Sequence, residues 1–87
     1  MSINKEIKDS MNEKKLVIGT RDVTSHAKKG QLKKIIHSNN IPLPMLKQLQ
    51  HYSKISSIEM AQFEGDSLML GQVCSKPFKI LSLGIKR

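Results

Sequence analysis

Short apolar runs alternate along this chain with amphipathic segments, and that alternation restricts the fold more than any other feature. The runs cover residues 16–18, 32–36, 58–63 and 78–85, and each has the length of a strand. Gly19, Gly30 and Gly65 interrupt the pattern, while Pro42 and Pro44 exclude a helix interior but suit a helix start. Strands that alternate with helices predict an α/β unit, with helices on both faces of a mostly buried sheet.

Four segments are predicted to be helical. Ser2 is placed to cap the first, whose apolar stripe recurs at every fourth position and consists of Ile3, Ile7 and Met11. A second helix is predicted to begin at a cap formed by Thr20 or Asp22 and to end at Gly30. The apolar residues of the third helix are Met45, Leu46, Leu49 and Tyr52. Residues 67–70 are predicted to form a last helical turn or two.

The charge of the chain is strongly positive and unevenly distributed. Its 87 residues make one domain, residues 1–87, with a net charge of +8. No Asp or Glu occurs between Val23 and Ile58, or from Ser67 to Arg87, although lysines recur in both stretches. Such a chain is predicted to present a basic face to a polyanion, with nucleic acid preferred over an anionic membrane. The alternative is a basic protein that has no specific partner.

Signals for secretion, membrane insertion and catalysis are weak. The single Cys74 excludes an internal disulfide and fits a reducing compartment. No apolar run approaches the roughly 20 residues that span a bilayer, so we predict a cytoplasmic protein without a membrane partner. His26, His37 and His51 lack the spacing of a metal pair, and no Gly-rich phosphate loop occurs. We therefore expect no enzyme activity, metal, cofactor or small-molecule substrate.

Two short polar segments follow predicted strands and are candidate binding loops. Gly19 lets a polyanion approach the unpaired N–H groups of a helix start, and Arg21 offers two donors to a phosphate or a guanine edge. Taken alone, the same turn is also consistent with a purely structural role. Asn39 and Asn40 either bind a splayed base or sugar edge, or simply tolerate turn geometry.

Residues 63–85 contain three short blocks in order: Phe-Glu-Gly, Leu-Gly and Val-Cys-Ser-Lys-Pro-Phe. This order resembles the distal signature of the L30e family of archaeal and eukaryotic large-subunit ribosomal proteins. Residues 16–21, Leu-Val-Ile-Gly-Thr-Arg, resemble the first strand and glycine loop of the wider kink-turn-binding L7Ae superfamily. The resemblance covers nearly the whole chain and implies a three-layer α-β-α sandwich with a mixed four-stranded sheet.

The resemblance also implies an RNA-binding site formed by three loops. The first loop of the superfamily meets the sheared guanine–adenine pairs of a kink-turn, which implies contacts from Gly19, Thr20 and Arg21. Lys28 or Lys29 is placed to reach the same phosphates, and Asn39 or Asn40 is implied as the contact of the second loop. The third loop covers residues 73–79, with an aliphatic contact, an aromatic ring and two lysines as candidates, namely Val73, Phe78, Lys76 and Lys79.

Three positions depart from the family pattern or have a second interpretation. Ser25 stands where the family often carries a lysine. Ser75 replaces the usual glycine, which costs about 1 kcal/mol if that position requires a positive φ. Phe78 is predicted to contact RNA because Lys76 and Pro77 precede it, but a core position is the alternative.

The function implied by the resemblance is that of a structural protein of the large ribosomal subunit. Its expected partners are a kink-turn or related internal loop of ribosomal RNA and the neighbouring large-subunit proteins, which makes it cytoplasmic and ribosome-associated. One alternative is a stand-alone kink-turn-binding platform protein of a small guide RNA particle. A third hypothesis is a protein-interaction module that has lost RNA binding.

Overall fold

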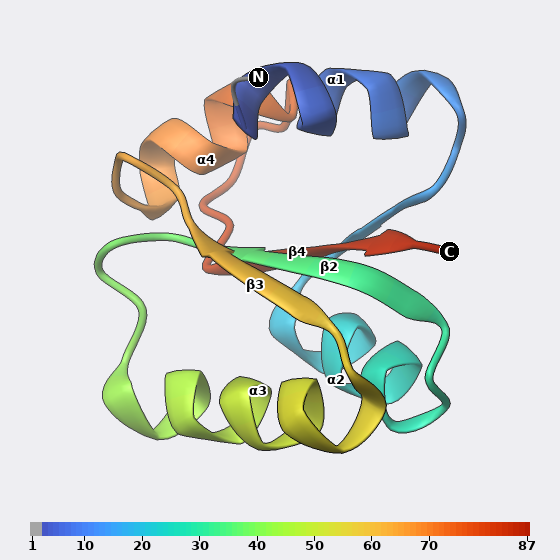
Figure 1. The fold of residues 1–87 in the computed structure, drawn as a ribbon. Helices are drawn as coiled ribbons and strands as arrows, with labels where there is room; N and C mark the ends of the chain where they lie inside the picture. The colour runs from blue at the N-terminus through green and yellow to red at the C-terminus, as the bar shows by residue number, and fades with distance from the viewer. Residues whose placement is uncertain (1–2) are drawn as a thin grey trace.

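Helices cover both faces of a central sheet in the computed structural model, which describes residues 3–87 and the side chains from Lys5 onward. Figure 1 shows α1 and α4 on one face of the sheet and α2 and α3 on the other. The elements run in the order α1 (Ile3–Asn12), β1 (Leu16–Ile18), α2 (Thr20–Lys28), β2 (Leu32–His37), α3 (Leu43–Ser56), β3 (Glu59–Gln62), α4 (Ser67–Val73) and β4 (Ser82–Lys86). The three-layer sandwich implied by the resemblance is confirmed.

The sheet is four-stranded and mixed, in the order β1-β4-β2-β3. Strand β4 runs antiparallel to both β1 and β2, whereas β3 is parallel to β2. Val17 and Ile35 both pair with Gly84, on opposite sides of the central strand. This topology places the carboxyl ends of β1, β2 and β3 at the same end of the sheet as the start of β4; this end is called the β4-start edge of the sheet below.

Each face of the sheet packs against its own hydrophobic core. Ile36 contributes to the core beneath α1 and α4, together with Ile7 and Leu70. Its neighbour Ile35 contributes to the core beneath α2 and α3, together with Leu49. Successive residues of a strand point to opposite faces, so a strand buried on both sides needs an unbroken apolar run. This requirement explains why the strands of the sequence read as continuous rather than alternating.

The last strand is shorter than predicted. It begins at Ser82 rather than at residue 78, because the preceding residues follow α4 instead of joining the ladder. The Ile80 N–H donates to the Ser67 carbonyl at 3.0 Å, which returns this segment to the first turn of α4. Ile80 is buried and Phe78 is exposed, so the apolar run continues although the strand does not. Helix α4 is correspondingly longer than predicted and ends at Val73.

The predicted side-chain cap of α2 is wrong. Gly19 occupies the N-cap position with φ +99°, and no side chain caps the helix. Neither Thr20 nor Asp22 caps the helix, because both lie inside its first turn. A cap that the sequence analysis missed occurs at α4, where the Asp66 carboxylate accepts a hydrogen bond from the Met69 N–H at 3.0 Å. The predicted cap at Ser2 lies outside the described residues.

Each of the four described helices is followed within two residues by a residue in the left-handed conformation, and among these only Gly30 is a glycine. The other three are Lys14, Ser57 and Ser75, with φ of 57°, 54° and 57°. After α4, the Lys76 N–H bonds the Gly71 carbonyl and the Ser75 N–H bonds the Gln72 carbonyl, which together form a Schellman motif. The position of Ser75 therefore does require a positive φ, and a residue with a Cβ is strained there.

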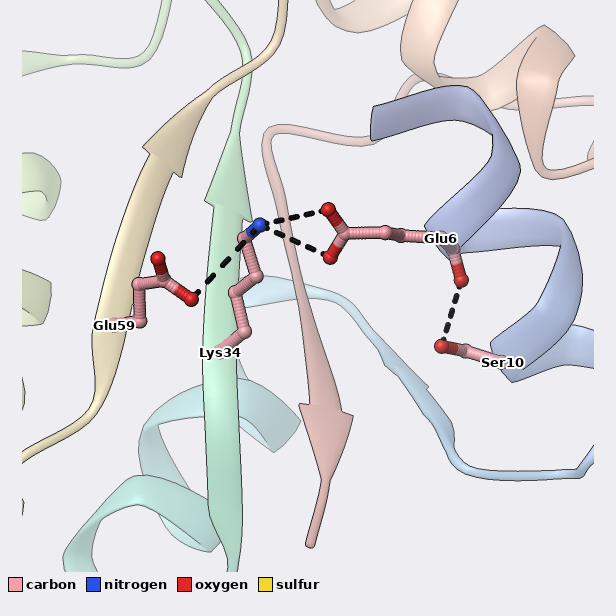
Figure 2. A network of polar contacts seen from close by, with 4 residues as sticks. All are labelled: Glu6, Ser10, Lys34 and Glu59. Atoms are coloured by element: carbon pink, nitrogen blue, oxygen red, sulfur yellow. Dashed lines mark hydrogen bonds and ion pairs between the residues drawn. The ribbon is translucent and has the colours of Figure 1, made fainter. Parts of the chain in front are cut away.

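One lysine of the acid-free stretch is neutralised inside the fold. Lys34 on β2 places its Nζ 3.0 and 2.9 Å from the two carboxylate oxygens of Glu6 on α1 (Figure 2). Glu59 on β3 lies 4.0 Å from the same Nζ, and the Ser10 hydroxyl donates to the backbone carbonyl of Glu6 at 2.8 Å. The Lys34 side chain is only 11% exposed, so it fastens α1 to the sheet rather than adding to a basic surface.

Candidate nucleic-acid interface

Three loops that are far apart in the sequence meet at the β4-start edge of the sheet. They are the turn from β1 to α2, the connection from β2 to α3, and the segment that links α4 to β4. The Gly19 N–H donates to the Ser82 carbonyl at 3.2 Å, and the Ser38 N–H donates to the Leu81 carbonyl at 2.9 Å. The segment before β4 therefore lies between the other two loops and holds both in place.

The first loop presents an uncapped helix start beside an exposed arginine. A glycine fits here because φ of +99° is strained for other residues, and the space around its Cα is open. The Thr20 hydroxyl forms a hydrogen bond with the Ser82 hydroxyl at 2.9 Å, which ties the start of α2 to β4. Arg21 is exposed. The first-turn N–H groups and the guanidinium are thus available to an anion.

The two asparagines of the second loop make different contacts. The Asn40 carboxamide accepts from the Ser67 N–H at 3.0 Å and donates to the Ser67 hydroxyl at 3.3 Å. That pair of bonds fixes the loop to the first turn of α4. Asn39 is exposed and is anchored through its backbone, whose N–H donates to the Gly65 carbonyl at 2.9 Å. Both asparagines are exposed, and Asn39 is the one whose side-chain amide does not take part in holding the loop.

The third loop is held tightly against α4 and turns an aromatic ring outward. An added Cβ on Gly71 would lie 2.1 Å from the Phe78 carbonyl oxygen, so only glycine allows this approach. The Phe78 side chain is 52% exposed, and Lys76 and Lys79 on either side of it are exposed as well. Val73 instead belongs to α4 and is half-buried against the core, so the loop proper begins after it.

The sequence of the chain matches a known protein family. The sequence matches the Ribosomal protein L7Ae/L30e/S12e/Gadd45 family over residues 1–87. The chain belongs to this family. The family resemblance derived from the two sequence motifs is thereby confirmed.

Relatives within the family include archaeal ribosomal proteins. The large ribosomal subunit protein eL30 of Methanocaldococcus jannaschii is 32% identical over 83 residues, which cover 95% of this chain and 76% of that protein. The protein of the same name from Methanothermobacter thermautotrophicus is 30% identical over 86 residues, covering 99% of this chain and 88% of its own length.

Solved structures show the same fold at lower sequence identity. A protein of unknown function from Bacillus halodurans C superposes with a TM-score of 0.83 at 21% identity, covering 93% of this chain and 80% of that one. The 15.5kD RNA binding protein of Giardia lamblia gives a TM-score of 0.83 at 13% identity, covering 93% of this chain and 68% of that one. At these identities the likeness concerns the fold alone.

The two lysines at the end of α2 lie in different surroundings. Lys28 lies on the same side as the first loop, because it lines a groove together with Thr20 and Arg21. Its Nζ stands 5.7 Å from the centre of the Tyr52 ring on α3, within the range of a cation–π contact. Lys29 is the C-cap residue of α2 and does not line that groove. The structure therefore groups Lys28, but not Lys29, with Arg21.

Cys74 lies beside the third loop but is chemically quiet. It is buried at the end of α4, and burial raises the pKa of its thiol to about 11, although the positive charge of Lys76 lowers that pKa in part. A thiol that stays protonated at neutral pH is a poor nucleophile. Cys74 instead packs in the core beneath α1 and α4.

Two residues that organise the site were missed by the sequence analysis. Ser82 contacts the first loop through both its carbonyl and its hydroxyl, and Ser67 binds the Asn40 side chain. Ser82 offered a signal, because it is a polar residue inside the apolar run of residues 78–85. Ser67 offered none, since a serine near a helix start is ordinary.

Proposed function

We propose that this chain is a structural RNA-binding protein of the large ribosomal subunit, and that it grips a kink-turn-like internal loop of ribosomal RNA. The observation that carries the proposal is the convergence of three loops on the β4-start edge of the sheet, each fixed by hydrogen bonds to its neighbours. A site that is rigid before binding loses little conformational entropy when RNA docks. Its role is one of shape recognition and charge neutralisation, not of catalysis.

Each loop supplies a different kind of contact. Arg21 and the uncapped start of α2 neutralise phosphates where the RNA backbones are forced together, and Arg21 can also read a guanine edge. Asn39 meets a base or sugar edge at the bend, whereas Asn40 acts by holding the loop. Phe78 packs against an unstacked nucleotide, with Lys76 and Lys79 on the adjacent phosphates.

The names of the archaeal relatives support the ribosomal context. Both are large-subunit proteins whose similarity extends over nearly this whole chain. A basic protein with ribosomal RNA as its partner is expected to be cytoplasmic and ribosome-associated, beside neighbouring large-subunit proteins. Within residues 3–87, no helix has the length and apolar character needed to cross a bilayer.

Titration of Arg21→Ala against a kink-turn RNA tests the proposal at one residue. The loss of a good bidentate contact costs about 1–3 kcal/mol, so the Kd should rise about fivefold to 150-fold. The domain should remain folded, because Arg21 is exposed and lies outside both cores. An unchanged Kd with an unchanged melting curve would remove Arg21 from the site.

Purification of the tagged protein from its own cells tests the ribosomal assignment. Recovery of intact large subunits with their proteins and RNA is the expected result. Recovery of a small guide RNA particle would assign the protein to that particle instead, and recovery without RNA would contradict RNA binding altogether.

A further inference from the structure

A shallow, open groove between α2 and α3 begins at the first loop. Its volume is about 460 Å³, and its lining residues are Thr20, Arg21, Thr24, Ser25, Lys28 and Gln48. Thr20, Thr24 and Lys28 follow one another at intervals of four along α2, which places them in one row. None of the lining side chains is acidic and two of them are cationic, so the groove suits an anionic ligand.

The groove is basic at both ends. Arg21 and Lys28 are seven residues apart, which corresponds to about 10 Å along the helix axis. The two helices that form the walls carry one acid, Asp22, which is exposed and does not line the groove. Helix α3 also carries Lys47 and Lys54 on exposed positions and has no acid of its own. The local field therefore attracts a polyanion along the length of the groove.

Tyr52 holds Lys28 in this position. Tyr52 is half-buried against the core beneath α2 and α3, and its ring lies 5.7 Å from the Lys28 Nζ. Tyr52 follows Gln48 by one helical turn, so both side chains lie on the face of α3 that is turned towards α2. A lysine restrained in this way loses less rotamer freedom on binding a phosphate than a free surface lysine does.

We propose that this groove is a second binding track that takes the phosphate backbone of one RNA strand as it leaves the bend, with Lys28 as its far phosphate contact and Tyr52 as the residue that positions Lys28. The inference rests on the proposed function, since it extends the RNA site from the three loops onto the α2–α3 face. It commits to RNA backbone as the occupant, because both charged side chains of the lining are cationic and none is acidic.

The test compares protein variants with matched charge changes and measures their affinity for a kink-turn RNA that has two long stems. Lys28→Gln removes a charge from the groove, and Lys54→Gln removes one from an exposed site on α3 outside it. Each phosphate contact adds about 0.9 to the slope of log K against log salt. Lys28→Gln should therefore lower the slope by about 0.9 and weaken binding about eightfold at 0.1 M salt, whereas Lys54→Gln should change little.

A gain of charge provides the complementary test. Gln48→Lys adds a charge inside the groove and should strengthen binding by a similar factor, while Gln50→Lys on the same helix, outside the groove, should not. If the Tyr52 ring positions Lys28, then Lys28→Gln should weaken RNA binding less in a Tyr52→Leu background than in the wild-type protein. Thermal melts of the same variants should show that they remain folded. Shortening the stem that crosses the groove should remove the Lys28 effect and leave the Arg21 effect in place.

The outcomes separate this inference from the proposed function. If the wild-type protein binds the kink-turn RNA tightly but Lys28→Gln and Lys54→Gln behave alike, the groove holds no phosphate and the three-loop site stands. Equal effects of Gln48→Lys and Gln50→Lys would lead to the same conclusion. If the wild-type protein does not bind the RNA, both proposals fail together.

Discussion

Replacing Phe78 with alanine separates a binding role for this ring from a structural one. The ring is 52% exposed, so its truncation removes about half of the roughly 1.5–3 kcal/mol that full burial of a phenylalanine contributes. We expect a stability loss of about 1 kcal/mol, which lowers the melting temperature of a domain this size by about 4–8 °C. If the ring packs against an unstacked nucleotide, RNA binding should weaken by a further 1–3 kcal/mol, or about fivefold to 150-fold.

Parallel thermal melts and titrations with a kink-turn RNA measure both effects on the same variants. Ile55→Ala is the matched control, because Ile55 is 66% exposed on α3 and lies outside the three loops. That control should lose little stability and no affinity. A core phenylalanine costs about 3–5 kcal/mol on truncation, so a drop in melting temperature far beyond 10 °C would assign Phe78 to the core. Unchanged RNA affinity in a folded Phe78→Ala protein would equally refute the contact.

Three further predictions concern stability and reactivity. Ser75→Gly should raise the melting temperature by several degrees, because glycine relieves about 0.5–1 kcal/mol of left-handed strain; a lower melting temperature would contradict this. Glu6→Gln should lower the free energy of unfolding by about 2 kcal/mol, because it leaves the Lys34 ammonium group buried beside a neutral amide. Glu13→Gln removes an exposed ion pair with Lys15 at 3.6 Å and should lower the free energy of unfolding by less than about 0.5 kcal/mol. Equal losses in the two variants would refute a structural role for the buried pair. Cys74 should react with iodoacetamide at pH 8 about a hundredfold more slowly than a free thiol, and faster as the pH rises towards 11; rapid labelling of the native protein at pH 8 would contradict the raised pKa.

Much of the fold could be predicted because its signals are local. The apolar runs, the glycine after β1 and the prolines before α3 each act within a few residues, and the corresponding elements appear where they were predicted. The boundary of β4 could not be found this way. Ile80 is buried against α4 and Ser82 against the first loop, so burial occurs on both sides of the point where the ladder begins and does not mark it.

The candidate site was predictable as three segments but not as an arrangement. The strand order, which brings those segments to the β4-start edge of the sheet, came from the family resemblance and not from spacing. The contacts that fix the loops, such as Asn40 with Ser67, join residues 27 positions apart and leave no periodic trace. Only those contacts show that Asn40 holds the loop and leaves Asn39 as the candidate RNA contact. The neutralisation of Lys34 by Glu6 was hidden for the same reason, because α1 and β2 meet only in the folded chain.

The central claim is that this protein recognises the shape of a kinked RNA and not merely its charge. The most direct measurement compares its affinity for a kink-turn RNA with its affinity for a continuous duplex of equal length and charge at one salt concentration. Specific protein–DNA complexes exceed non-specific ones by about a thousandfold or more, and we predict a ratio of that order here. Binding to the kink-turn should also weaken steeply with salt as phosphates are neutralised. Equal affinities for the two RNAs would show a basic protein without shape recognition and would contradict the account.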